Sequence, residues 1–420
     1  MPHPESPQPE PSSQETERSP KEELAALKAR TEEFRLELEQ AAKTGDLTRA
    51  RSLKAELQAR TSRLKERIQG PEVLTQVEAI VPNFREQYQA SLKTLTDNKL
   101  VSTLESGSVG IKAIDGQEYP LPSLEEVAQR LVAYNRETKQ GLETKHQQGF
   151  AKLVLVPFGS PLRRLTEAYQ TELLTRFVSK TPTPAKGTDH LEPAPSSRLR
   201  GSNGELLPVH FENNQLSPLW VWDELNKAEG ADAAGEMLYN PTSFPKNQDP
   251  KVRRAQSAGQ TKLELLAKEG AFQVYLVEAD AKGHMREIPR AGTNEVILGR
   301  KRLEAGLQPR NYLATHQHPE TDLKQNPYHL EQGMTPELAI ILNLQHLRET
   351  DQVLDDWDAK DSQGNPVASI NFLTGAYLPA SDSVPTFDWD RGTRQANLSR
   401  YDPGAAGDYL GVRPAVRVKA

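Results

Sequence analysis

The sequence contains no cysteine in its 420 residues. Disulfide bonds, thiol nucleophiles and cysteine-ligated metal sites are therefore excluded. Apolar runs are also short, and none approaches the roughly 20 residues that a membrane-spanning helix needs. Residues 1–5 lack the basic and then apolar pattern of a signal peptide. These absences predict a cytoplasmic protein with no membrane span.

The sequence also lacks an excess of basic over acidic residues. The 52 Lys and Arg residues are outnumbered by 58 Asp and Glu residues, and the formal net charge is -6. Nucleic-acid-binding domains normally carry a basic excess, so no nucleic-acid partner is expected. Apolar residues make up only 36% of a chain that has 31 prolines, which indicates globular parts joined by polar segments. At roughly 100–200 residues per domain, the length allows two or three domains.

The N-terminal part of the chain has two compositions. Residues 1–20 are mostly Pro, Ser, Glu and Gln, which predicts a disordered arm because little apolar surface is available for burial. Residues 21–70 repeat apolar side chains at helical spacing on both sides of Gly45. This pattern predicts an antiparallel helical hairpin or coiled coil. Because a hairpin buries little by itself, it is either a solvated arm or a device for homo-oligomerisation.

Two larger segments follow, joined by a Pro-rich linker at residues 181–217. The segment 71–180 mixes helical spacing with strand patterns at 109–114 and 153–156. It is expected to form a small mixed α/β region, to which no activity can be assigned. A second domain is expected over residues 218–420.

The second domain has clear helix and strand signals. Thr335-Pro336 is a strong helix opening, with Thr as the cap and Pro at the first helical position, and the apolar spacing continues to about Trp357. Together with a strand at 271–277, these elements predict an α+β fold. Beyond Gly364 the pattern is one of short strands and turns. These strands are expected at 368–373, 376–379, 385–389, 395–400 and 410–418.

Common catalytic motifs are absent from the sequence. No phosphate-binding Gly-x-x-x-x-Gly-Lys occurs, and no Gly-x-Gly-x-x-Gly follows a strand. The residues around Ser108 resemble the nucleophile elbow of a serine hydrolase, but the Gly two positions before Ser108 is missing. No catalytic residue is therefore predicted.

Two polar stretches were considered as metal sites. His316, His318 and Glu320 offer two imidazoles and a carboxylate, but they lie in a polar stretch that is typical of a loop. The acids from Asp355 to Asp361 lack the spacing of a calcium-binding helix-loop-helix. The solvated end of a helix is the simpler interpretation of these acids. No metal ligand is predicted, and a metal-dependent enzyme that uses His316, His318 and the acids near Asp356 stays an alternative.

The C-terminal block has the most informative composition. Residues 371–418 contain no Lys, Glu, Met or His, although Lys and Glu are common elsewhere in the chain. The block is instead rich in Asp, Asn, Ser, Thr, Tyr, Arg, Gly and Ala. Tyr, Ser, Gly and Asn, with Arg, are the residues that antibody paratopes favour. A simpler explanation, which involves no binding function, is that strands and turns are poor in Lys and Glu in any protein.

Several motifs in this block resemble a known family. The run GVRPAVRV at 411–418 resembles the closing strand of the C-type-lectin-like fold, as used in formylglycine-generating-enzyme-like domains. The runs GAYLPAS at 375–381, WDRGTR at 389–394 and ANLSR at 396–400 resemble the variable proteins of diversity-generating retroelements. In that family an error-prone reverse transcriptase rewrites adenine-rich codons, which never become Lys, Glu, Gln, Met or Trp.

The resemblance implies a C-terminal C-type-lectin-like domain over 218–420 and a set of diversified, ligand-facing positions. The implied ligand-facing positions are Phe387, Asp388, Asp390, Thr393, Arg394, Asn397, Ser399, Tyr401, Asp402, Ala405, Ala406, Asp408 and Tyr409. The implied scaffold positions are Trp389, Leu398, Gly411 and Arg413.

The sequence lacks residues that two related classes of protein need for their activities. Formylglycine-generating enzymes need cysteines, and sugar-binding lectins need a Glu-Pro-Asn or Gln-Pro-Asp loop, which this sequence lacks. The prediction is a non-enzymatic protein, without a cofactor, that binds an unidentified protein ligand. The alternatives are a metal-dependent enzyme of the same fold superfamily and a structural or adhesin protein assembled through residues 21–70.

Overall fold

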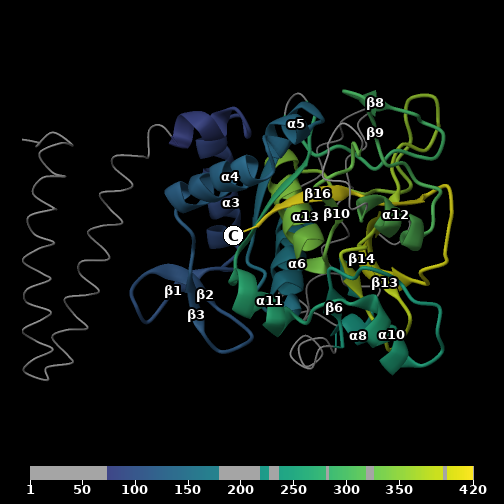
Figure 1. The fold of residues 1–420 in the computed structure, drawn as a ribbon, viewed down its shortest axis with the longest axis horizontal. Coiled ribbons are helices and arrows are strands. Elements are labelled where there is room, and N and C mark those ends of the chain that lie inside the picture. Colours follow the sequence, from purple (N-terminus) through teal and green to yellow (C-terminus); the bar gives the residue numbers. More distant parts are fainter. Residues whose placement is uncertain are drawn as a thin grey trace, which may run out of the picture. The chain divides into compact units, whose positions relative to one another are not determined.

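The computed structural model describes residues 73–178, 218–226, 236–280, 283–317, 326–390 and 395–419. The predicted arm, helical hairpin and linker lie outside these residues, and so does any oligomerisation through the hairpin. The segment Gln76–Ala420 forms one compact unit. Its mixture of helices and sheets confirms the predicted α+β class (Figure 1).

A four-stranded sheet runs through this unit in the order β10-β16-β7-β4, and all neighbours in it are antiparallel. Its strands are β4 (Phe150–Val156), β7 (Gln273–Glu278), β10 (Glu331–Gly333) and β16 (Pro414–Val418). Strand β4 comes from the segment that we expected to form a separate α/β region. Because β4 pairs with β7 along its length, the expected boundary at 181–217 does not separate two folding units.

A five-stranded sheet is formed mainly by the C-terminal block, in the order β15-β11-β13-β14-β5. Its strands are β5 (Leu219–Val221), β11 (Ile370–Phe372), β13 (Val384–Asp390), β14 (Gln395–Tyr401) and β15 (Leu410–Gly411). The prediction of a single strand over 410–418 was wrong in one respect. It is split into β15 and β16, which belong to different sheets, so the chain passes from one sheet to the other at Val412 and Arg413.

Helix α13 (Pro336–Thr350) contacts both β4 and β13, one strand from each of the two large sheets. It is apolar around most of its circumference, as expected of a helix enclosed by protein, and every side chain from Pro336 to Leu347 is buried. The hydroxyl of Thr335 accepts the Leu338 N–H at 3.3 Å, as the cap signal predicted. The helix ends at Thr350 rather than at Trp357, because Asp351 adopts a left-handed conformation with φ 59°.

The remaining helices lie around these sheets, and two of them begin with a capping box (Figure 1). Ser123 and Glu126 form a reciprocal capping box at the start of α4, and Thr261 and Glu264 form another at the start of α11. The helices are α3 (Phe84–Asp97), α4 (Leu124–Glu137), α5 (Gly141–Gln147), α6 (Leu162–Val178), α8 (Asp223–Asn226), α10 (Pro250–Ser257), α11 (Lys262–Glu269) and α12 (Pro309–His316).

Three small sheets complete the described chain. They pair β1 (Ser102–Thr103), β2 (Val109–Lys112) and β3 (Glu118–Pro120), then β6 (Leu238–Tyr239) with β12 (Ala376–Tyr377), and β8 (Val296–Ile297) with β9 (Arg300–Lys301). A turn at Asp115-Gly116 joins β2 to β3, which pair in antiparallel fashion. Gly116 has φ +80° there, a conformation that favours glycine.

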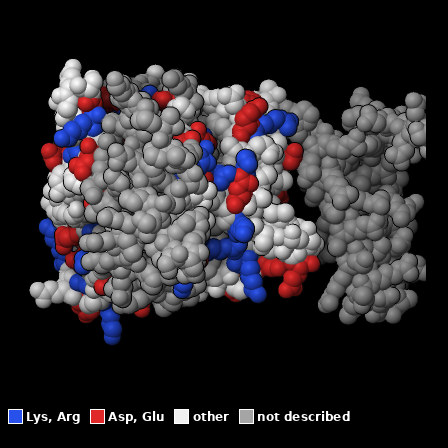
Figure 2. Space-filling view, turned by 180° about the vertical axis from the view of Figure 1, so that it is seen from behind, with Lys and Arg blue, Asp and Glu red and all other residues white. Residues whose placement is uncertain are grey.

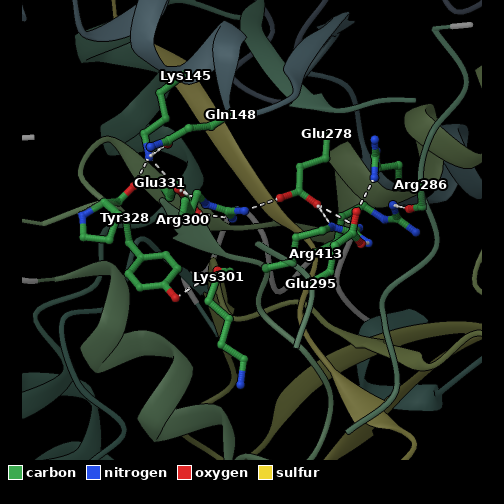
Figure 3. A network of polar contacts seen from close by, with 12 residues as sticks. Lys145, Gln148, Glu278, Arg286, Glu295, Arg300, Lys301, Tyr328, Glu331 and Arg413 are labelled. Atoms are coloured by element: carbon green, nitrogen blue, oxygen red, sulfur yellow. Dashed lines mark hydrogen bonds and ion pairs between the residues drawn. The ribbon is translucent and has the colours of Figure 1, made fainter. Parts of the chain in front are cut away.

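A buried ionic network holds α5, β9 and β10 together (Figure 3). The Lys145 ammonium lies 2.5 Å from Glu331 Oε1, and Arg300 donates two hydrogen bonds of 2.7 Å to the same carboxylate. The Lys145, Glu331 and Arg300 side chains are all 0% exposed. The Arg300 guanidinium also lies over the Phe150 ring, 5.0 Å from its centroid. A complete set of partners offsets the cost of burying these charges.

The network continues from Arg300 toward the loop that precedes β8. Arg300 Nη1 lies 2.6 Å from Glu278 Oε1, and Arg302 donates to the other oxygen of Glu278 at 2.9 and 3.0 Å. Glu295 then joins Arg302 to Arg286 (Figure 3). Because Glu278 belongs to β7, these bonds fasten the segment 283–302 to the centre of the four-stranded sheet.

Surface charge is mixed rather than concentrated. On the face seen in Figure 2, the described basic and acidic side chains alternate over the surface. In the part of the chain that the structure describes, no helix is both long and apolar enough to cross a membrane.

Candidate functional site

The five-stranded sheet carries a hollow of about 590 Å³ on one of its faces, which we call the sheet hollow. Cavities of this size are typical of ligand-binding sites. The residues that line the sheet hollow are Trp220, Trp357, Ile370, Asp388, Asp390, Asn397, Ser399, Tyr401 and Tyr409.

Strand register explains why these side chains meet. In the β13–β14 hairpin, Asp388 is paired with Asn397, and Asn397 is paired in turn with Trp220 of β5. Residues paired across neighbouring strands point to the same side of a sheet, and successive residues alternate. Asp388 and Asp390 of β13 and Asn397, Ser399 and Tyr401 of β14 therefore lie on the side of the sheet hollow, while the residues between them point to the opposite face.

Aromatic rings form much of the wall. The Trp357 and Tyr409 rings pack at a centroid distance of 5.9 Å and an interplanar angle of 41°. The Tyr401 ring meets Phe372 edge-on, with centroids 6.0 Å apart and an angle of 87°. Phe372 belongs to a buried apolar cluster against which Trp357, Tyr401 and Tyr409 pack. Because these rings pack against the buried cluster, little side-chain entropy remains to be lost when a ligand binds.

Asp388 places a carboxyl group at a nearly closed position in the sheet hollow. Its side chain is 5% exposed, and Oδ2 accepts a hydrogen bond of 3.1 Å from Asn397. Burial raises the pKa of Asp388 to about 7, the Asn397 bond acts in the opposite direction, and the charges of Asp390 and Asp355 raise it further. This carboxyl group therefore gains or loses its proton near neutral pH.

The Asp388→Asn variant is expected to be more stable than the unmodified protein at pH 8, but not at pH 4. A carboxyl group whose folded pKa is raised stabilises the fold at low pH, and this contribution is lost as the pH rises toward about 7. The difference should reach on the order of 1–3 kcal/mol above pH 7. Urea unfolding at pH 4.5, 6, 7 and 8 measures it, and a difference that does not change with pH would contradict the raised pKa.

The structure brings together several of the positions implied by the family resemblance. Those that line the sheet hollow are Asp388, Asp390, Asn397, Ser399, Tyr401 and Tyr409. Asp402, Ala405, Ala406 and Asp408 lie outside it, in the loop between β14 and β15. Thr393 and Arg394 lie outside the described residues.

Phe387 was predicted to face the ligand, and this prediction was wrong. Its side chain is 0% exposed and lies between Asp388 and Thr386, so it points to the opposite face of the sheet. There its ring packs against Tyr169 of α6, with centroids 5.8 Å apart. The alternation of the strand predicts that Phe387 and Asp388 differ in direction, but it does not say which of them faces the hollow.

The predicted scaffold residues are all buried. Trp389 and Leu398 are 2% and 0% exposed and share the face of Phe387. A Cβ atom at Gly411 would lie only 2.6 Å from Ile288 Cγ2, so only glycine fits without a shift of its neighbours. The Arg413 guanidinium donates to Asp355 Oδ1 and to the Arg286 carbonyl, at the point where the chain changes sheets.

Three residues of the sheet hollow were not predicted as ligand-facing. Trp220 comes from β5, far from the C-terminal block in sequence, and reaches the site because β5 pairs in parallel with β14. Trp357 follows α13, and Ile370 begins β11. The alternation of Leu219-Trp220-Val221-Trp222 was a usable signal for Trp220, since it places both Trp residues on one face. Trp357 and Ile370 had no comparable signal.

The acids considered for a metal site have other roles. Asp355 and Asp356 are 0% and 5% exposed, so they do not form the solvated helix end that we expected.

His316, the other residue considered as a metal ligand, has a lowered pKa. Burial lowers the pKa of His316 to about 4. The charges of Arg300 and Lys145 lower it further, whereas the charge of Glu331 raises it. Within the described ranges, no group of three His, Cys, Asp or Glu side chains is placed to hold a metal ion. His318 and Glu320 lie outside those ranges.

Comparison with known proteins identified no relative of this chain. No family model, no curated protein and no solved structure matches this chain. The lining of the sheet hollow offers aromatic faces, hydroxyl groups, an amide and carboxylates, which suit recognition of a polar ligand.

Proposed function

We propose that this chain is a non-enzymatic binding protein that recognises a protein partner through the sheet hollow and the loop 402–409 beside it. The scaffold in this proposal is C-type-lectin-like, and the surface is of the diversifiable kind found in the variable proteins of diversity-generating retroelements. Recognition would depend on rigid aromatic rings combined with short polar side chains, as in antibody paratopes.

One observation supports this proposal above the others. Of the eleven described positions that the family resemblance implies, six line one hollow, namely Asp388, Asp390, Asn397, Ser399, Tyr401 and Tyr409. The scaffold positions between them in β13 and β14, Trp389 and Leu398, are buried in the core. A surface that can vary needs this separation, because changes in the hollow then leave the packed face intact.

Differential capture tests the binding function. A variant that combines Asn397→Ala, Ser399→Ala and Tyr401→Ala removes side chains from the sheet hollow. A control variant combines Glu86→Ala, Gln89→Ala and Glu137→Ala, which are exposed on α3 and α4. The unmodified protein and the control are expected to capture the same partner from lysates of the source cells and of other cells that the source cells contact. The hollow variant is expected to capture at least 90% less of this partner. Quantitative mass spectrometry measures the captured amount.

The result is interpretable only if the variants are folded. Circular dichroism and thermal unfolding of all three proteins provide that check. Equal capture of the same partner by a folded hollow variant would contradict the proposal. Sequencing of the DNA next to the gene tests diversification separately. Diversification requires a near-identical downstream repeat that differs only at adenines, and a reverse-transcriptase gene beside it.

A further inference from the structure

Trp357, which forms part of the wall of the sheet hollow, does not belong to a helix or a strand. It lies in a turn after the end of α13, and its ring packs on Tyr409, which lies in the loop before β15. Regular secondary structure therefore fixes neither ring. The backbone that carries Trp357 must be held by contacts with neighbouring segments.

Arg290, which does not line the sheet hollow, contacts the backbone of this turn. Its Nη2 donates to the Trp357 carbonyl oxygen at 2.5 Å. Burial lowers the pKa of Arg290, and the charges of Asp408 and Asp358 act in the opposite direction. Asp358 follows Trp357 and Asp408 precedes Tyr409. The guanidinium therefore lies close to both chain segments that carry the paired rings.

A second contact holds the same turn two residues before Trp357. It comes from the segment 286–290, which we call the strap. The Glu287 carboxyl group accepts the Asp355 N–H at its Oε2, with a distance of 3.1 Å. The strap is fastened in turn by Arg302, whose Nη2 donates to the Glu287 carbonyl oxygen at 2.9 Å. The strap is thus bonded to the turn both at Asp355 and at Trp357.

We propose that Glu287 and Arg290 are positioning residues of the sheet hollow, which hold Trp357 in the wall through the backbone of residues 355–357. Neither side chain lines the hollow, so both act through Trp357 and not by touching the ligand. A ring that is already held in place loses less entropy on binding, so loss of the strap contacts weakens binding. This inference rests on the proposed function, because it takes the sheet hollow as the binding site.

The contact of Glu287 depends on a proton. Arg413 Nη2 lies 3.8 Å from Glu287 Oε2 and also donates to Asp355 Oδ1, so two carboxyl groups share one guanidinium. Like charges this close disfavour each other. Burial and the charge of Asp355 raise the pKa of Glu287 to about 8, against the effects of Arg413 and of the Asp355 N–H bond.

The sign of the pH dependence follows from this raised pKa. A carboxyl group whose pKa is raised in the attached strap favours attachment at low pH. Attachment is therefore strongest below the ordinary Glu pKa of about 4.3 and weakens as the pH rises to about 8. The Glu287 side chain is 33% exposed, so after ionisation it can turn toward water and leave the Asp355 N–H without its acceptor.

Other charged and titratable groups surround the two carboxyl groups. Asp388 has a pKa raised to about 7 by burial, so its own titration must be separated from that of Glu287. The remaining groups are Asp356, Arg302, His346 of α13 and Tyr169 of α6.

Fluorine NMR of the full-length protein labelled with 5-fluorotryptophan tests the role of Arg290. Trp357→Phe assigns the Trp357 signal, and Trp222, which does not line the hollow, is the reference. At pH 7, Arg290→Met is expected to shift the Trp357 signal only. Hydrogen–deuterium exchange of residues 354–358, measured by mass spectrometry, should become at least tenfold faster. Arg290→Lys still offers a donor and should restore at least half of the protection.

An exposed arginine provides the matched control. Arg85→Met on α3 should change neither the Trp357 signal nor the exchange of residues 354–358. In the capture experiment described above, Arg290→Met should retain at least threefold less partner than Arg85→Met. Thermal unfolding shows whether each variant is folded, and Arg290→Lys decides the result if Arg290→Met does not fold.

A pH series tests the role of Glu287 in an Asp388→Asn background, which removes the titration of Asp388. The Trp357 signal is expected to shift with one midpoint between about pH 6 and 8. Adding Glu287→Gln should abolish this shift and keep the signal seen at low pH, because the amide oxygen still accepts the Asp355 N–H and carries no charge. Adding Glu86→Gln, on the exposed face of α3, should leave the midpoint unchanged.

Four results would overturn the inference. They are an unchanged Trp357 signal in Arg290→Met, an equal change at Trp222, a pH-dependent shift that persists in Glu287→Gln, and equal capture by Arg290→Met and Arg85→Met. The spectroscopic measurements contain no ligand, so they are separate from the proposed function. If they fail while the hollow variant still loses its partner, the binding function stands and the positioning role falls. If the hollow variant captures its partner normally, the binding function falls, and the role in binding falls with it.

Discussion

The Glu331→Gln variant is expected to lose about 3–5 kcal/mol of the free energy of unfolding. Glutamine has nearly the same shape, so the change removes the charge and little else. Lys145, 0% exposed and 2.5 Å from Glu331, would lose its carboxylate partner. Arg300 would keep only Glu278 as a charged partner. An unpaired buried charge costs far more than a paired one, which is why the expected loss is large. Chemical denaturation measures it.

Two further variants isolate the cause of that loss. Glu167→Gln breaks the exposed pair with Arg163, whose side chain is 52% exposed, and should cost no more than about 0.5 kcal/mol. Adding Lys145→Met to Glu331→Gln should recover part of the lost stability, since the unpaired ammonium is then removed as well. Similar small losses in the Glu331 and Glu167 variants would show that the buried network contributes little to stability.

The Phe387→Ala variant is expected to lose about 3–5 kcal/mol, because a fully buried ring leaves a cavity that its neighbours fill only in part. Ser399→Ala lies on the opposite face of the same hairpin, in the sheet hollow, and is expected to cost less than about 1 kcal/mol. The two changes compare a core position with a position in the sheet hollow, on paired strands.

Thermal and urea unfolding of both variants provides the measurement. A loss below about 1 kcal/mol for Phe387→Ala would return this residue to the ligand-facing set and contradict its packing against Tyr169. A large loss for Ser399→Ala would mean that the sheet hollow is part of the core. It could then not serve as a surface that tolerates variation.

Local signals in the sequence were reliable where one segment decides its own structure. The cap signal at Thr335 marks a helix start that the structure contains, because the Thr335 hydroxyl accepts the N–H of Leu338 three residues away. The end of α13 was not predictable in the same way. It depends on Asp351 adopting a left-handed conformation, and an apolar spacing that continues to Trp357 does not reveal this.

Non-local pairing explains most of what the sequence did not reveal. Strand β4 pairs with β7 although more than a hundred residues lie between them, and the Pro-rich composition of 181–217 suggested a boundary instead. In the same way, β5 brings Trp220 to β14. No periodicity within one segment encodes its partner strand, because sheet pairing depends on which surfaces remain to be covered once the chain is compact.

The candidate site shows the same division on a smaller scale. Composition by itself identified a block without Lys, Glu, Met or His. The predicted ligand-facing set nevertheless included both Phe387 and Asp388, which point to opposite faces of β13. Only the tertiary structure decided which set lines the sheet hollow, because Phe387 packs against Tyr169 of α6 on one face and Asp388, Asn397 and Ser399 lie on the other. The period of a strand is a local property, whereas the burial of one of its faces depends on the element that packs against it.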